Sequence, residues 1–97
     1  MNFNDLKTAD MRLVMLRSIA DDGYSLNESL LQAVLELYGH FVNRDRVRTE
    51  MRWLEEQGLV VIEDFAGVLV AKLTGRGGEV AEGRARIDGV KRPRPKG

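Results

Sequence analysis

Four arginines lie within nine residues of the chain: Arg44, Arg46, Arg48 and Arg52. A guanidinium group donates two parallel hydrogen bonds, either to O6 and N7 of a guanine or to the oxygens of a phosphate. Asn43, directly before the first arginine, is a strong helix N-cap, and the N-terminus of a helix favours phosphate. This spacing predicts a helix that binds DNA with its first turns.

A helix that begins after Asn43 buries one side of this segment. Val47, Met51 and Leu54 recur at i, i+4 and i+7, which makes a single apolar stripe. At about 100° per residue, Asp45, Thr49, Arg52 and Glu56 then face away from the core, and Arg48 flanks them. The candidate DNA-binding residues of the helix are Asn43, Arg44, Asp45, Arg46, Arg48, Thr49 and Arg52.

The same arginines have an alternative role as partners of nearby carboxylates. Arg46 can pair with Glu50 at i,i+4, and Arg48 can pair with Glu55. Both roles stay open at the level of the sequence.

Elsewhere in the chain, no combination of residues indicates catalysis or a cofactor. The chain has no cysteine, and its one histidine, His40, has no nucleophile pattern beside it, so we expect a solvated turn residue or a minor binding contact. Structural zinc takes four Cys or His ligands. The segment Gly75-Arg76-Gly77-Gly78 matches no phosphate-binding loop and is expected to be a flexible turn. We therefore expect a protein that is not an enzyme and needs no metal or cofactor.

Charge is distributed unevenly, although the formal net charge is zero. Residues 1–37 contain three basic and six acidic side chains, whereas residues 84–97 contain six basic and one acidic. A basic end favours an anionic partner, so Lys91, Arg92 and Arg94 join the candidate DNA-binding residues. Few apolar residues follow position 88. We therefore expect residues 1–87 to form one domain and residues 88–97 a disordered basic tail.

A chain of 97 residues is long enough for one small core. No apolar run approaches the roughly 20 residues that span a bilayer, and the first residues show no signal-peptide pattern. A cytoplasmic protein is expected.

The hydrophobic periodicity predicts three helices, two strands and a weak last helix. The first helix covers residues 8–21, the second runs from a Ser25–Glu28 capping box to Gly39, and the third follows Asn43 and stops at Gln57–Gly58. Strands are predicted over residues 59–63 and 68–73, with a hairpin between them and a weak helix over residues 74–84. Phe41 is expected to plug the core, and Trp53 to pack at its edge.

This order resembles a known family. Residues 10–19 (DMRLVMLRSI) look like the first helix of ArsR-type and MarR-type winged-helix regulators of bacteria, and residues 47–60 (VRTEMRWLEEQGLV) are similar to their recognition helix. Residues 68–74 (VLVAKLT) look like the returning strand of the wing. The resemblance covers about residues 10–84, and the small size is similar to winged-helix proteins of prophages. The implied fold is α+β, mostly α: a winged helix-turn-helix with three helices, a β-hairpin wing and a weak C-terminal helix.

The resemblance implies a transcriptional regulator that inserts its third helix into the major groove of double-stranded DNA. It also implies a homodimer, with the first helix and Glu79–Ile87 as the expected surfaces. Two departures matter: the cysteine ligands of the metal-sensing members are missing, and the wing, Glu63–Gly67, is acidic. Acidic residues there and a neutral chain favour an alternative, a winged-helix module for protein–protein interaction without DNA binding.

Overall fold

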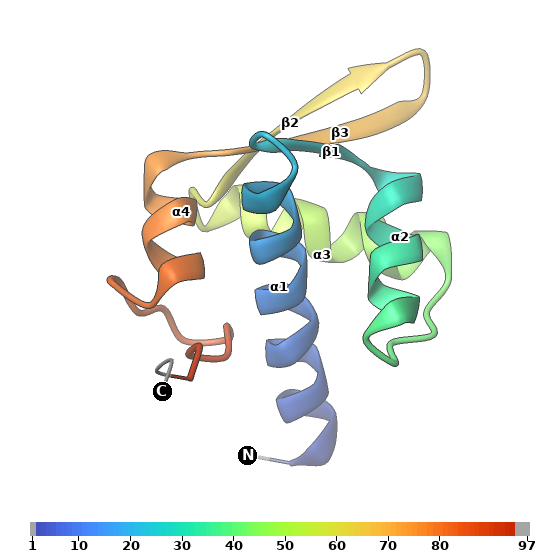
Figure 1. Ribbon diagram of the computed structural model, residues 1–97. Coiled ribbons are helices and arrows are strands. Elements are labelled where there is room, and N and C mark those ends of the chain that lie inside the picture. Colours follow the sequence, from blue (N-terminus) through green and yellow to red (C-terminus); the bar gives the residue numbers. More distant parts are fainter. Residues whose placement is uncertain (1, 95–97) are drawn as a thin grey trace.

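A three-stranded antiparallel sheet lies on one side of the molecule, and the helices lie beneath it (Figure 1). The computed structural model describes residues 2–94. In chain order the elements are α1 (Phe3–Asp21), β1 (Ser25–Asn27), α2 (Glu28–Leu37), α3 (Arg44–Glu56), β2 (Val60–Phe65), β3 (Val68–Leu73) and α4 (Gly75–Glu82). The expected class, α+β with mostly helix, is confirmed. Among the described residues no helix is both long and apolar enough to cross a membrane.

Helix α1 begins five residues before the predicted start at Thr8. The Asn2 side chain accepts a hydrogen bond from the Asp5 N–H at 2.9 Å, and the Asp5 carboxylate accepts one from the Asn2 N–H at 3.4 Å. Together these bonds satisfy two N–H groups that a helix start leaves open. The polar residues 2–7 therefore extend the helix beyond its apolar stripe.

Strand β1 was not predicted, and the capping box assigned to Ser25 and Glu28 is wrong. Ser25–Asn27 instead pairs antiparallel with β3, which makes the strand order β1-β3-β2. The N-cap of α2 is Asn27, whose side chain accepts the Leu30 N–H at 2.8 Å. Glu28 thus becomes the first residue of the helix, and its carboxylate is free to contact other elements.

Strands β2 and β3 form the predicted hairpin, with β2 longer at its C-terminal end than expected. Ala66 and Gly67 form its turn with positive φ of 53° and 88°, as tight hairpin turns of this twist require. The Asp64 carboxylate accepts the Gly67 N–H at 2.8 Å. One acidic side chain of the hairpin is therefore engaged in holding the turn.

Residues 75–78 form the first turn of α4, so the expectation of a flexible turn is wrong. Thr74 caps the helix through the Gly77 N–H at 3.0 Å. Gly77 is buried, and a Cβ atom there would lie 2.0 Å from the Leu59 carbonyl oxygen. The glycine allows α4 to approach the strand start closely. The helix ends at Glu82, before the predicted Arg84, because Gly83 adopts a left-handed φ of 83°.

The core lies between the sheet and the helices and contains the predicted stripe of Val47, Met51 and Leu54. Trp53 packs half-buried against it, as expected at the core edge. Phe41 was expected to fill the core, but its side chain is exposed, because the loop after α2 runs along the outside of the molecule (Figure 1).

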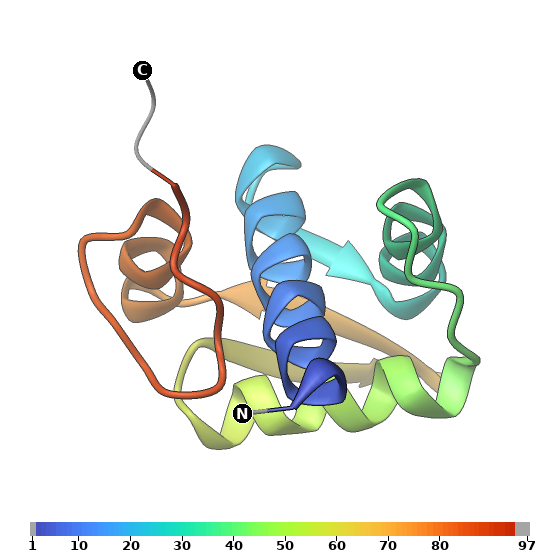
Figure 2. The same cartoon turned by 90° about the horizontal axis from the view of Figure 1, so that it is seen from below.

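Beyond α4 the chain returns alongside α1 (Figure 2). Ile87 and Val90 pack half-buried against the core, and the Lys91 N–H donates to the Ala9 carbonyl oxygen at 3.1 Å. The sequence predicted a disordered tail over residues 88–97. In the structure, residues 88–94 of this segment lie alongside α1. Residues 95–97 lie outside the described residues.

Candidate nucleic-acid interface

The exposed face of α3 carries the residues expected there. Asp45, Thr49 and Arg52 are exposed, as is Arg44 in the first turn. Asn43 caps the helix by accepting the Arg46 N–H at 2.8 Å. The Thr49 hydroxyl donates to the Asp45 carbonyl oxygen at 2.9 Å, which leaves its oxygen as an acceptor. The predicted start and outward face of the helix are confirmed.

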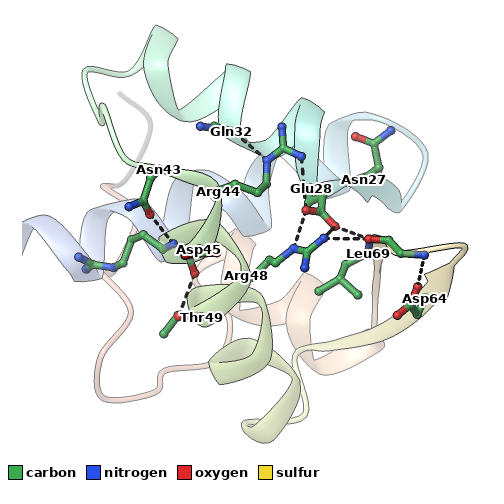
Figure 3. Close-up of polar contacts among 12 residues, drawn as sticks. Asn27, Glu28, Gln32, Asn43, Arg44, Asp45, Arg48, Thr49, Asp64 and Leu69 are labelled. Atoms are coloured by element: carbon green, nitrogen blue, oxygen red, sulfur yellow. Dashed lines mark hydrogen bonds and ion pairs between the residues drawn. The ribbon is translucent and has the colours of Figure 1, made fainter.

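A buried carboxylate, Glu28, lies at the junction of α2, α3 and β3 (Figure 3). Arg48 donates to it twice, from Nε at 2.7 Å and from Nη2 at 3.0 Å, and the Leu69 N–H donates to one of its oxygens. Arg44 adds a longer contact of 3.4 Å. These donors, Arg48 first, outweigh burial and lower the pKa of Glu28, so the group is a carboxylate at neutral pH.

Arg48 also connects α3 to the hairpin, because its Nη2 donates to the Gly67 carbonyl oxygen at 2.8 Å. Its pKa is raised, mainly by the hydrogen bond to Glu28. The alternative partner expected for Arg48, Glu55, is therefore wrong. Once Asn27 caps α2, the carboxylate of Glu28 lies within reach of Arg48, and the pair joins three elements.

A second buried carboxylate, Glu50, joins α3 to α1. It accepts from Arg12 Nε at 2.7 Å and from Arg46 Nε at 2.8 Å, and Arg46 also donates to the Thr8 hydroxyl at 2.7 Å. The Arg12 guanidinium stacks 3.6 Å from the centre of the Trp53 ring. The predicted pair of Arg46 and Glu50 is confirmed, and it forms part of a network that fixes α3 against α1.

Arg52 has the most exposed ion pair of the four arginines. Its Nη1 lies 3.0 Å from Glu55 Oε1, with 50% of the arginine side chain and 36% of the glutamate side chain exposed. The other Glu55 oxygen accepts the Ile62 N–H of β2 at 3.2 Å. Each arginine of α3 thus has a carboxylate partner, and the partners Glu28 and Glu50 are buried whereas Glu55 is partly exposed.

The basic C-terminal residues lie beside α1 rather than beside the start of α3. Lys91 is 3.3 Å from Asp10, which also contacts His40 at 2.7 Å. Arg92 and Arg94 are exposed and line a shallow groove next to Arg17 of α1. Figure 2 shows this segment on the opposite side of α1 from α2 and the start of α3. The two groups of candidate residues therefore do not form one continuous site.

His40 is buried, which corrects the expectation of a solvated turn residue. Burial raises the pKa of Asp10, but the hydrogen bonds from His40 and Lys91 outweigh it, and the net shift is downward. The sequence did not indicate the contacts of Glu28 with Arg48, of Glu50 with Arg12, or of Asp10 with His40 and Lys91, because the partners in each contact lie on different parts of the fold.

Relatives of this chain occur in a phage and in a bacterium. It is 56% identical over 93 residues to gp26 of Escherichia phage Mu, a match that covers 96% of this chain and 97% of that protein. The chain belongs to the phage Mu gp26 family. A protein of Haemophilus influenzae is 51% identical over 77 residues, covering 78% of this chain and 76% of its own length. Both relatives are described as uncharacterized. No family model and no solved structure matches.

Proposed function

We propose that this gp26-family protein is a winged helix-turn-helix protein that binds double-stranded DNA with α3 and regulates transcription. The observation that carries the proposal is the exposed polar face of α3, which follows α2 through a short loop and precedes the hairpin. A helix in this position is suited to enter the major groove with its N-terminal residues on the base edges.

The strength of their carboxylate contacts divides the arginines of α3 into two groups. Exposed ion pairs contribute about 0–1 kcal/mol, so DNA can replace the contact between Arg52 and Glu55 at little cost. Glu28 holds Arg44 less tightly than Arg48, since Arg44 Nη1 lies 3.4 Å from that carboxylate, while Arg44 Nε donates to the uncharged Gln32 side chain at 2.7 Å. Arg46 and Arg48 bind the buried carboxylates of Glu50 and Glu28 at 2.8 and 2.7 Å, and moving either arginine to a phosphate would remove a close charged partner from a buried carboxylate.

The DNA-contacting set that we propose on α3 is therefore Arg44, Thr49 and Arg52, with Asn43 and Asp45 at the helix start. Arg46 and Arg48 position the helix. The hairpin is not proposed as a contact, since Glu63 pairs with Lys72 and Asp64 holds the turn, and neither side chain would attract phosphate. Lys91, Arg92 and Arg94 supply a separate basic surface for more distant phosphates.

The test is the fluorescence anisotropy of a labelled random-sequence duplex, titrated at 50 and 200 mM salt. If Arg44 and Arg52 each neutralise one phosphate, they predict an affinity loss of about 12-fold across this range. The double variant Arg44→Ala/Arg52→Ala should weaken binding and flatten the salt dependence. The matched control is Arg76→Ala, which removes an exposed arginine from α4. Equal effects of the two variants would refute the assignment to α3.

A protein-interaction module of the same fold is a second candidate, and a specific observation favours it. All four arginines of α3 already contact carboxylates, and α3 carries as many acidic as basic residues. Such a neutralised surface suits a protein partner better than a polyanion. Absence of DNA binding by the parent chain at 50 mM salt would refute the first proposal and leave this one standing.

A further inference from the structure

A groove runs along the exposed face of α1, between the end of α2 and the C-terminal segment. Its floor comes from one face of the helix, since positions 10, 13, 14, 17, 18 and 21 recur at helical spacing. Tyr38 at the end of α2 borders the groove, as do residues 91–94. Figure 2 shows α1 between these two parts of the chain. The groove has a volume of about 380 Å³, which lies within the range of small-ligand sites.

The groove carries positive charge that the fold does not neutralise. Arg17, Arg92 and Arg94 are exposed, and within residues 2–94 none of them lies within 4.0 Å of a carboxylate oxygen. Every arginine of α3, by contrast, has a carboxylate partner. An anion can therefore bind in the groove without displacing an existing ion pair.

Two carboxylates also line the groove, and one of them is already occupied. Asp10 contacts His40 at 2.7 Å through Oδ2 and Lys91 at 3.3 Å through Oδ1. Asp21, at the end of α1, has no ion pair in the described part of the chain. Three unpaired arginines thus outnumber one unpaired carboxylate, and the net positive charge attracts an anion.

The side of the groove formed by residues 91–94 is fixed to the rest of the protein. The Lys91 N–H donates to the Ala9 carbonyl oxygen at 3.1 Å. Pro93 packs against Gly83, where a Cβ atom would lie 3.0 Å from the proline ring. The two arginines that flank Pro93 are therefore held beside α1 before any ligand arrives, which lowers the entropy cost of binding.

Tyr38 adds an aromatic ring to this charged groove, and its side chain is 65% exposed. An exposed ring beside arginines is the combination that binds single-stranded nucleic acids, because a base stacks on the ring while the phosphates contact the cations. In a duplex each base is stacked between its neighbours, so its face is not accessible to a side chain. The groove therefore fits an unpaired nucleotide better than it fits a duplex.

We propose that this groove binds single-stranded nucleic acid, with one base stacked on Tyr38 and the neighbouring phosphates on Arg17, Arg92 and Arg94. Lys91 is not counted among the phosphate contacts, because Asp10 is its partner. The site is separate from α3, so it does not rest on the binding of duplex DNA proposed above.

The test is the fluorescence anisotropy of two labelled strands of about 12 nucleotides, oligo(dT) and oligo(U), titrated with the full chain at 50 and 200 mM salt. Three phosphate contacts to a single strand predict an affinity loss of about 18-fold across this range, and Arg17→Ala/Arg92→Ala should reduce this loss to about threefold. The matched control, Lys7→Ala/Arg76→Ala, removes two exposed cations outside the groove and should bind like the parent. The strand that binds more tightly identifies DNA or RNA as the ligand.

The stacked base has its own pair of variants. Tyr38→Ala should weaken binding about fivefold or more, the effect of losing one stacked base. Tyr38→Phe keeps the ring and should bind like the parent. All the substituted side chains are exposed, so every variant should melt like the parent, which circular dichroism checks.

A parent chain that binds neither strand at 50 mM salt would overturn the proposal. Equal affinities of Tyr38→Ala and Tyr38→Phe would also overturn it, because the groove would then hold phosphates by charge alone. So would a loss of single-strand binding in Arg44→Ala/Arg52→Ala that the groove variants do not show, since the site would then lie on α3. Single-strand binding without duplex binding refutes only the proposed function, and duplex binding without single-strand binding refutes only the groove.

Discussion

The carboxylate of Glu28 should be a main determinant of stability. It is 1% exposed and accepts hydrogen bonds from Arg48 and from the Leu69 N–H. In Glu28→Ala the Leu69 N–H stays buried without an acceptor, which costs about 1–3 kcal/mol. Arg48 can turn toward water, so the loss of its bonds adds only about 1 kcal/mol. We expect a total loss of about 2–4 kcal/mol in the free energy of unfolding.

Urea unfolding followed by circular dichroism measures this loss as a lower midpoint with an unchanged slope. Glu28→Gln keeps an oxygen for the Leu69 N–H, so it should cost less, about 1 kcal/mol. Glu36→Ala, on the exposed side of the same helix, is the matched control and should stay within about 0.5 kcal/mol of the parent. If Glu28→Ala is as stable as Glu36→Ala, the carboxylate does not hold the three elements together.

Three further predictions concern pH and the core. Because the pKa of Glu28 is lowered on folding, its carboxylate stabilises the fold above the ordinary glutamate pKa, and this contribution is lost as pH falls through the lower folded value. The difference in unfolding free energy between the parent and Glu28→Gln should therefore shrink to zero in urea titrations at acid pH. A difference that stays constant with pH would contradict this reasoning. Gly77→Ala should lower the melting temperature strongly, because the new Cβ would lie 2.0 Å from the Leu59 carbonyl oxygen. The control is Gly78→Ala, whose Cβ has no contact closer than 3.8 Å, and it should melt at the parental temperature or above. Val47→Asp should abolish the cooperative melt, since the side chain is fully buried and an unpaired carboxylate is costly there; a parental melt would mean that this face of α3 is not in the core.

The elements with strong local signals were predictable. Asn43 as N-cap, the stripe from Val47 to Leu54 and the stop at Gly58 all lie within one segment, and α3 follows them. Strand β1 had no such signal, since it has three residues and pairs with β3, more than forty residues later. Locally, Ser25 and Glu28 satisfy the capping-box spacing equally well, and only the presence of β3 favours the strand.

In the candidate site, too, the sequence predicts some features and only the tertiary structure shows the others. The sequence by itself determined that four arginines lie on one helix and which of its faces is apolar, because helical spacing alone sets both. The tertiary structure decided which arginines are available, since Glu28 of α2 meets Arg48 of α3, and Glu50 of α3 meets Arg12 of α1, only after the helices pack. Ion pairs between elements depend on distances that no local pattern encodes.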